Sequence, residues 1–191
     1  VCPTAASTVI GVDIVRREFA WVYRYPREVP TPAEGRNFWQ QQQIQNQLLR
    51  PNDQWLDNAA IIVDDRVLLT PPESSELHCV DLHTGKLLWK RQQGDALFIG
   101  GVDDGVVLLV GPHGMQAVRL SDRAAAWKQE SVALPGGALP AGQGYLSQGH
   151  YFLPLTSGQI AEVDMATGAI TNHGSPTPDV SLGNLICYRG S

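Results

Sequence analysis

The sequence predicts an all-β fold in which short antiparallel strands form repeated four-stranded sheets. Short apolar runs alternate with turn residues along most of the chain, and its 19 Gly and 13 Pro are spread among them. No apolar run is long enough to span a membrane. A hairpin pattern in which an Asp is followed eight residues later by a Trp also recurs along the chain.

The clearest copy of this hairpin runs from Cys79 to Trp89. The Asp81 carboxylate can accept hydrogen bonds from backbone N–H groups further along the turn, and Gly85 can adopt the positive φ that a tight turn needs. Thr84 lies between them, and Trp89 is a large apolar side chain with a single N–H donor. These features indicate a structural hairpin that packs against a neighbour, in preference to a catalytic loop.

Three further segments repeat the hairpin with substitutions. Arg119 takes the Asp place in one copy, and Asn172 takes the Trp place in another. The four Asp places are positions 13, 81, 119 and 164, so the copies are 68, 38 and 45 residues apart. The residues predicted to shape these turns or to dock one sheet on the next are Asp13, Trp21, Asp81, Thr84, Gly85, Trp89, Trp127, Asp164, Thr167 and Gly168.

The last two separations match one β-propeller blade of four strands, which takes about 40–50 residues. The first separation is longer because a Pro- and Gln-rich insertion, 27–58, interrupts it, and we expect a loop with a helical turn or two there. One propeller segment of about four blades is therefore predicted over 1–191, either a partial propeller or half of an eight-bladed ring. Its predicted blades are 1–25, 59–94, 95–134 and 139–175, with a further strand at 182–188.

Alternating apolar residues between turn signals predict the strands within these blades. The first blade has only three, and the strand count allows the tail strand Leu182–Tyr188 to complete it. The others are Val1–Thr4, Thr8–Ile14, Phe19–Tyr25, Ala60–Val63, Val67–Thr70, Glu76–Leu82, Leu87–Arg91, Leu97–Val102, Val106–Val110, Met115–Leu120, Ala125–Gln129, Gly144–Ser147, Tyr151–Thr156, Gln159–Met165 and Ala169–Asn172.

The hairpin resembles the tryptophan-docking repeat of the pyrroloquinoline-quinone (PQQ) type β-propellers. The resemblance rests on Asp81, Thr84, Gly85 and Trp89, with Cys79 in the place of a small residue, and it covers nearly all of the chain outside 27–58. It implies a ring of seven or eight blades in which each Trp packs between neighbouring blades and bonds to the next blade's backbone. The family includes quinoprotein dehydrogenases with PQQ and Ca²⁺, and cofactor-free scaffolds such as a propeller lipoprotein of outer-membrane barrel assembly.

The resemblance implies that a dehydrogenase of this family carries an adjacent Cys-Cys disulfide, axial carboxylates that bind calcium, and an Asp base. This sequence has no such pair, because Cys2, Cys79 and Cys187 lie far apart; a Cys2–Cys187 bridge is left open as a minor alternative. Asp64-Asp65 and Asp103-Asp104 stand at turns, where Asp is expected. We therefore predict no catalytic, cofactor-binding or metal-binding residue here, with PQQ and Ca²⁺ relevant only to a larger parent protein.

The histidines show no metal-ligand spacing on one element, and they are expected at the surface or at strand edges. No Ser lies in a nucleophile elbow, so no nucleophile, base and orienting group can be assembled. The five histidines are His78, His83, His113, His150 and His173.

Two functions remain as hypotheses. One is a non-catalytic propeller scaffold that binds a protein or peptide, and the alternative is part of a quinoprotein dehydrogenase. The net charge of −5, with acids and bases interspersed, disfavours nucleic-acid binding. Both ends fall beside strand-like runs, so we expect a piece of a longer chain, either completed by a second copy or by the rest of the propeller. The compartment is left open, with an exported or periplasmic parent as one expectation.

Overall fold

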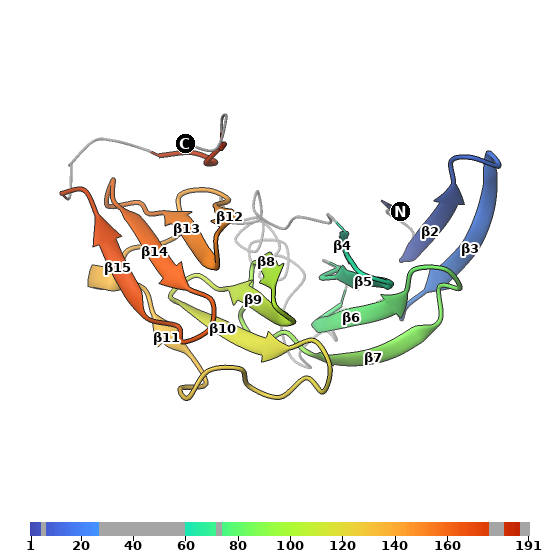
Figure 1. Cartoon of the computed structure of the whole chain (residues 1–191), viewed down its shortest axis with the longest axis horizontal. Coiled ribbons are helices and arrows are strands. Elements are labelled where there is room, and N and C mark those ends of the chain that lie inside the picture. The colour runs from blue at the N-terminus through green and yellow to red at the C-terminus, as the bar shows by residue number, and fades with distance from the viewer. Residues whose placement is uncertain (5–6, 27–59, 72–73, 176–181, 188–191) are drawn as a thin grey trace, which may run out of the picture. The chain divides into compact units, whose positions relative to one another are not determined.

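The computed structural model describes residues 1–4, 7–26, 60–71, 74–175 and 182–187, and it confirms the all-β prediction (Figure 1). The strands form four antiparallel sheets. No α-helix occurs in these ranges, where a 3-10 turn at Pro135–Gly137 is present. The predicted insertion at 27–58 lies outside the described residues. The chain divides into two compact units, Val1–Gly94 and Asp95–Ser191, each with two sheets.

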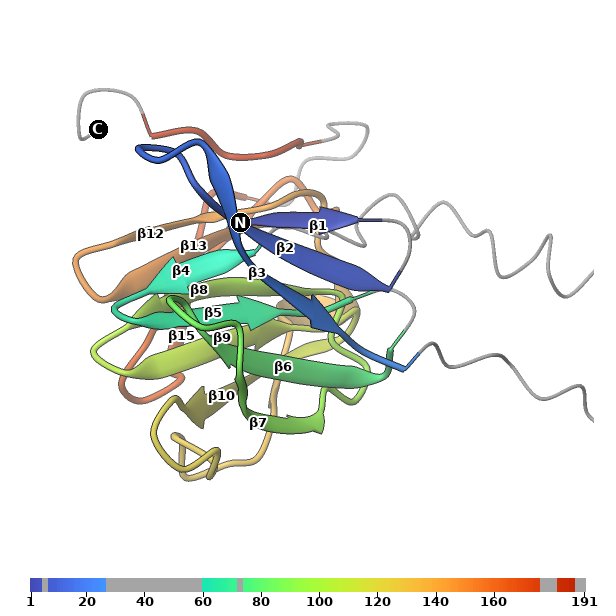
Figure 2. The same ribbon diagram turned by 90° about the vertical axis from the view of Figure 1, so that its right-hand side faces the viewer.

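The first unit holds a three-stranded sheet and a four-stranded sheet, and strands that follow one another in sequence pair side by side (Figure 2). A two-residue turn joins β4 to β5, where Asp64 adopts a positive φ of 49°. Asp tolerates this left-handed conformation better than most residues, as the sequence pattern predicts. The first sheet is β1 (Cys2–Thr4), β2 (Thr8–Asp13) and β3 (Glu18–Arg24); the second is β4 (Ile61–Val63), β5 (Arg66–Leu69), β6 (Glu76–Asp81) and β7 (Leu87–Gln92).

The second unit holds two four-stranded sheets with the same sequential order. Asp104 and Gly105, with φ values of 43° and 73°, form the turn between β8 and β9. The third sheet is β8 (Phe98–Asp103), β9 (Val106–Val110), β10 (Gly114–Arg119) and β11 (Val132–Ala133); the fourth is β12 (Tyr145–Ser147), β13 (His150–Pro154), β14 (Ile160–Asp164) and β15 (Ile170–His173).

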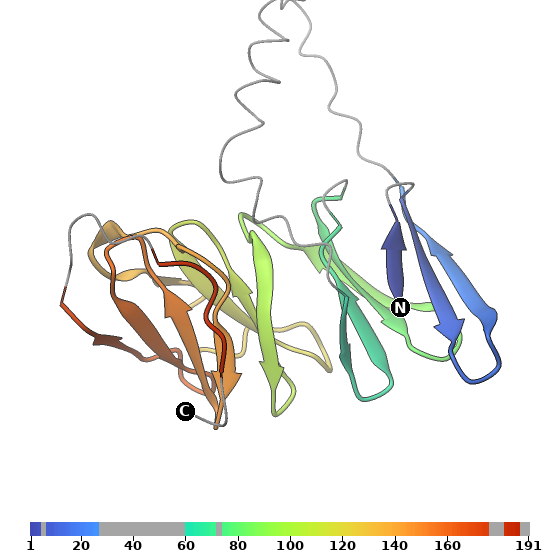
Figure 3. The same ribbon diagram turned by 90° about the horizontal axis from the view of Figure 1, so that it is seen from above.

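Each unit has a core between its two sheets, which lie side by side in the view from above (Figure 3). In the first unit, Val9 and Trp21 from the first sheet pack with Val67, Leu69 and Val80 from the second. Val67 and Leu69 are two residues apart on β5, and Val80 is paired with Val67, so these three side chains lie on one face of the second sheet. The core of the second unit contains Phe98, Leu108, Val110, Met115, Ala117, Trp127, Leu134, Tyr151, Leu153, Leu155, Ala161, Val163 and Met165.

The prediction of a strand at Ala125–Gln129 is wrong. Ala125 makes a single bridge to Val118, and the last strand of the third sheet is instead Val132–Ala133, paired with Gly114 and Met115. The run of alanines at 124–126 offers no β-branched or aromatic side chain for cross-strand pairing, which is the main source of strand stability.

The prediction that the tail forms a strand is also wrong over its described part. Residues 182–187 belong to no strand. The Leu185 N–H donates to the Gln143 carbonyl at 2.8 Å, and the Gln143 N–H donates to the Asn184 side-chain oxygen at 2.8 Å. The second of these bonds uses a side chain, so no backbone ladder forms around Asn184.

Candidate functional site: the docking turns and the open face of the first sheet

Trp21 docks the first sheet on the second. Its indole N–H donates to the Leu82 carbonyl at 2.6 Å, and its side chain is buried in the core of the first unit. A Cβ on Gly85, whose φ is +66°, would lie 2.6 Å from ring atom Cδ2. A Cβ on Gly11, which is paired with Trp21 across the sheet, would lie only 2.2 Å from ring atom Cε2. The indole therefore rests on two positions that only glycine can occupy.

Trp127 docks the third sheet on the fourth in the same way, through an indole hydrogen bond to a carbonyl and contact with a left-handed glycine. Its indole N–H donates to the Met165 carbonyl at 2.9 Å, and the side chain is 4 % exposed. Gly168 has a φ of +76°, and a Cβ there would lie 2.6 Å from Cδ2 of the ring. The acceptor carbonyl in both cases belongs to the residue that follows the motif Asp. The motif thus supplies an indole from one sheet, and from the next sheet the turn that contains the acceptor carbonyl and the glycine beneath the ring.

The motif aspartates hold the backbone of these turns in shape by accepting hydrogen bonds from it. The Asp81 carboxylate accepts from the Thr84 N–H and hydroxyl, both at 2.7 Å, and from the His83 N–H at 3.1 Å. These hydrogen bonds from Thr84 lower the pKa of Asp81. Asp164 accepts from the Thr167 N–H at 2.7 Å and from its hydroxyl at 2.9 Å, and its pKa is lowered for the same reason.

The first turn uses the same device with a different sequence. Asp13 accepts hydrogen bonds from the N–H groups of Val15 and Arg16, both at 2.9 Å. Arg17 then stands in the place of Gly85 and Gly168, with a φ of 59°. A non-glycine residue in this left-handed region is uncommon and energetically unfavourable.

The third turn keeps its shape although Arg119 replaces the motif Asp. Asp122, in the Thr place, accepts from the Ala124 N–H at 3.0 Å and pairs with Arg119 Nη2 at 3.0 Å. The backbone bonds from Arg119 N–H to the Ala124 carbonyl and from Arg123 N–H to the Arg119 carbonyl match those at Asp81 and Asp164. The carboxylate has moved three residues along the turn. The sequence pattern does not predict that Asp122 replaces the missing motif carboxylate, although an Asp three residues after Arg119 is a signal that could have indicated it.

The remaining two Trp places are less regular. Trp89 is half-buried, and within the described ranges its buried indole N–H has no hydrogen-bond partner. Its docking role stays a prediction. In the fourth sheet, Asn172 is eight residues after Asp164 but lies opposite Ala161, whereas Thr171 lies opposite Glu162. The first two sheets contain a bulge that brings Trp21 opposite Gly11 and Trp89 opposite Cys79, and the β14–β15 pair has none.

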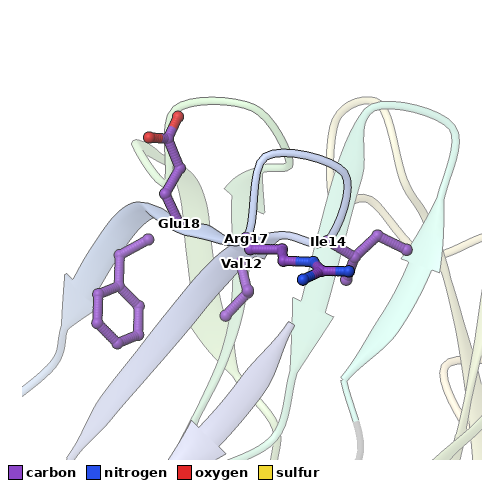
Figure 4. A pocket seen from close by; sticks show the side chains of 5 residues that line it. Val12, Ile14, Arg17 and Glu18 are labelled. Atoms are coloured by element: carbon purple, nitrogen blue, oxygen red, sulfur yellow. The ribbon is translucent and has the colours of Figure 1, made fainter.

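One face of the first sheet is apolar and open. Val12 is 39 % exposed, whereas Val80 and Val163, which also directly precede the motif Asp, are fully buried. Phe19 and Ile14 are 75 % and 84 % exposed. Together with Arg17 and Glu18 they line a shallow hollow of about 440 Å³ at the β2–β3 turn (Figure 4). We call this surface, Val12, Ile14, Arg17, Glu18 and Phe19, the open face.

The expectation that every histidine lies at the surface or a strand edge is wrong for His78. This side chain is 1 % exposed, with Nδ1 2.7 Å from the Tyr23 hydroxyl and Nε2 3.1 Å from the Ser74 hydroxyl. Tyr23 comes from β3 and His78 from β6, so the contact is a polar link between the first two sheets. Burial, and then the charge of Glu76, raise the pKa of Tyr23. The Ser74 hydroxyl and the His78 imidazole are in contact as in a catalytic Ser–His pair, but Ser74 is itself buried, so its hydroxyl is not accessible to a substrate.

The other histidines offer no better catalytic group. His83 is exposed beside Asp65, and His113 is exposed. On the fourth sheet His173 contacts the Glu162 carboxylate, and His150 lies 3.8 Å from it. Within the described residues no group of three or more His, Cys, Asp or Glu side chains is arranged to hold a metal ion. All three cysteines are free; Cys79 is buried, and burial raises its pKa to about 11.

No helix in the described part of the chain is both long enough and apolar enough to cross a membrane. The sequence matches the PQQ_2 family, described as outer membrane protein assembly factor BamB, over residues 28–180. No protein of curated function matches it.

Among solved structures, the chain is similar to BamB from Moraxella catarrhalis, with a TM-score of 0.56 and 17 % identity over 87 % of this chain and 46 % of that one. It is also similar to two computationally designed proteins. These are Ika4, with a TM-score of 0.54 and 13 % identity over 69 % of this chain and 79 % of that one, and Ika8, with 0.52 and 15 % over 69 % and 40 %. The chain spans about half the length of BamB, and at these identities the likeness establishes the β-propeller fold.

Proposed function

Because the chain belongs to the PQQ_2 family of BamB-like propeller repeats, we propose that it is a non-catalytic scaffold that binds another protein. The observation that carries this proposal is that Trp21 and Trp127, with the turns that accept their indole N–H groups, dock one sheet on another. The open face agrees with this, because it is an apolar surface that a further protein surface can cover. Val12, Ile14 and Phe19 keep large apolar side chains in water at a place where the second and fourth sheets are covered. Exposed apolar patches of this kind are typical of protein interaction sites.

The polar residues of the motif support the same proposal. Asp81 and Asp164 each accept hydrogen bonds at Oδ1 from a turn N–H group and from a threonine hydroxyl, so these carboxylates shape the turns that dock one sheet on another. The Cys79 thiol is buried and has a raised pKa, which is the opposite of a reactive nucleophile. Asp81, Asp164 and Cys79 therefore have structural roles in the turns and the core.

The test compares this scaffold with the alternative, part of a PQQ-dependent dehydrogenase. The purified chain and its full-length parent are mixed with PQQ and Ca²⁺, and quinone absorbance and alcohol-dependent dye reduction are recorded. We expect neither signal from either protein. The same two proteins, immobilised, are expected to retain a partner protein that then binds the purified chain in calorimetry. Quinone-dependent dye reduction by the parent would overturn the scaffold proposal.

The solution mass addresses the predicted partner copy. A monomer of 20.8 kDa at low concentration would remove the two-copy ring and leave the rest of a longer propeller as the completing part. A stable dimer that dissociates on dilution would support the second copy.

A further inference from the structure

A buried histidine links the two sheets of the first unit. His78, on β6, is 1 % exposed, and its side chain lies on the same face of the second sheet as Val80, which packs against the first sheet. Its Nδ1 lies 2.7 Å from the hydroxyl of Tyr23 on β3, and its Nε2 lies 3.1 Å from the hydroxyl of Ser74. The imidazole therefore connects the first sheet with the loop that precedes β6.

The repeat itself does not require a histidine at this position. In the fourth sheet the equivalent residue, three before the motif Asp, is Ala161, which is fully buried in the core that contains Trp127. The residue two after each docking Trp differs as well, because Tyr23 is half-buried and Gln129 is exposed. We call the contacts of Trp21 and Tyr23 with the second sheet the first junction, and the contacts of Trp127 with the fourth sheet the second junction. At these two positions the first junction has an ionisable pair, whereas the second has an alanine and a glutamine.

The surroundings of His78 favour its neutral form. Leu69 of β5 is paired with it across the sheet, and the buried Tyr25 ring lies 5.6 Å from the imidazole. Lys90 of β7 is its partner on the other side, but Lys90 Nζ lies 2.8 Å from the Glu76 carboxylate, so these two charges offset each other at the imidazole. Burial then decides, because it disfavours the charged imidazole. Among the described residues of this interface, the ionisable side chains on the face of His78 are Tyr23, Tyr25, Glu76 and Lys90.

We propose that His78 makes the docking of the first sheet on the second depend on pH. Above about pH 6.5, the ordinary pKa of histidine, the imidazole is neutral whether the junction is closed or open, and docking is at its most stable. Below this pH the imidazole of the open junction takes up a proton that the buried imidazole excludes, so acid favours opening. The second junction, with Ala161 in this place, keeps its docking. The inference goes beyond the scaffold function and does not depend on it.

Hydrogen exchange of the whole chain between about pH 5 and pH 8 measures the opening of each junction. Amides of β2 and β3 report on the first junction, and amides of β13 and β14 report on the second. Dividing each observed rate by the intrinsic exchange rate at the same pH gives the opening equilibrium. We expect the opening of the first junction to rise by up to about tenfold for each pH unit below about 6.5, the limit for uptake of one proton. The opening of the second junction should stay unchanged over this range.

Two variants identify the titrating group. His78→Gln keeps a polar side chain but cannot take up a proton, so it should remove the pH dependence of the first junction whatever its effect on stability at pH 8. His83→Gln is the matched control, because His83 is the other histidine of Val1–Gly94 and is exposed beside Asp65. This variant should keep the pH dependence of the unchanged chain. NMR of the imidazole protons in the unchanged chain gives a second measurement, in which the His78 signal should keep its neutral position to a lower pH than the His83 signal.

Three results would overturn the proposal. PH dependence that persists in His78→Gln, or that disappears in His83→Gln, would assign the proton to another group. An equal response of the two junctions would mean that acid acts on the whole chain and not on the docking of the first sheet. A His78 signal that titrates together with the His83 signal in the folded chain would show that the buried imidazole does not exclude the proton; this measurement stands even if His78→Gln fails to fold.

Discussion

Replacing Trp127 by alanine should destabilise the second unit by about 3–5 kcal/mol, the range for a buried aromatic side chain. The structure places the side chain at the high end of burial, with 4 % exposure and contacts to both sheets of the unit. The loss has two parts: the packing of the ring, and the hydrogen bond to the Met165 carbonyl at 2.9 Å. Because Met165 is also buried, its carbonyl would lose a partner that water cannot easily replace.

Trp127→Phe separates the two parts. It keeps most of the apolar ring and removes the indole N–H, so we expect a loss of about 1–3 kcal/mol, the cost of an unsatisfied buried acceptor. Leu88→Ala is the control, because Leu88, on the outer strand β7, is also a large apolar residue but is 47 % exposed. Its loss should stay below about 1 kcal/mol.

Urea unfolding followed by far-ultraviolet circular dichroism gives these free energies by linear extrapolation. Hydrogen exchange then locates the loss, which should appear in amides of β13 and β14 and spare β5 and β6. A loss under about 1 kcal/mol for Trp127→Ala, or equal losses for the alanine and phenylalanine variants, would show that the indole is not docked as described.

Three further outcomes follow from the titratable groups. Hydrogen bonds from Thr167 lower the pKa of Asp164 in the folded state. The stability that the ionised Asp164 carboxylate contributes is therefore present above about pH 4 and is lost as the pH falls through the lowered pKa. Thr167→Val should flatten the acid limb of a curve of unfolding free energy against pH. Burial raises the pKa of Tyr151 to about 12, so the stability contributed by its neutral hydroxyl is complete below about pH 10 and is lost as the pH rises towards 12. Absorbance of tyrosinate at alkaline pH, with unfolding curves at the same pH values, would record this loss. Ionisation of all tyrosines near pH 10 in the folded protein would contradict it. Burial also raises the pKa of Cys79 to about 11, so a thiol reagent at neutral pH should label the two exposed cysteines and spare Cys79 until the chain unfolds; a Cys2–Cys187 bridge would show as labelling of neither.

The local chemistry of the turns could be predicted from the sequence because each turn is built by residues close together in the chain. Asp81, Thr84 and Gly85 form a hydrogen-bonded turn with a positive φ, as their residue types require. The all-β fold followed from alternation and spacing, which are also local properties. The PQQ-type resemblance, carried by the same residues, is confirmed by the family match.

What the sequence could not reveal depends on contacts between distant segments or on register. His78 looked like one more strand-edge histidine, and only the approach of Tyr23 and Ser74 shows it to be buried. The motif offset marked Asn172 as the Trp equivalent, but the face on which a residue lies depends on whether the strand contains a bulge. The open face was hidden for a related reason: Val12 has the residue type of a core position, and its exposure depends on what lies beside it.

The bulges also bear on how such repeats diverge. In the outer strands of the first two sheets, Ala20 and Leu88 are the unpaired extra residues that set the side-chain alternation beyond them. In β15 the pairing is regular, and a bulge at Thr171 would bring Asn172 opposite Glu162 with no insertion or deletion in the gene. The pairing of a single residue therefore decides which side chain of the outer strand lies opposite the second residue before the motif Asp, and amide exchange at 170–173 would report on the pairing of β15.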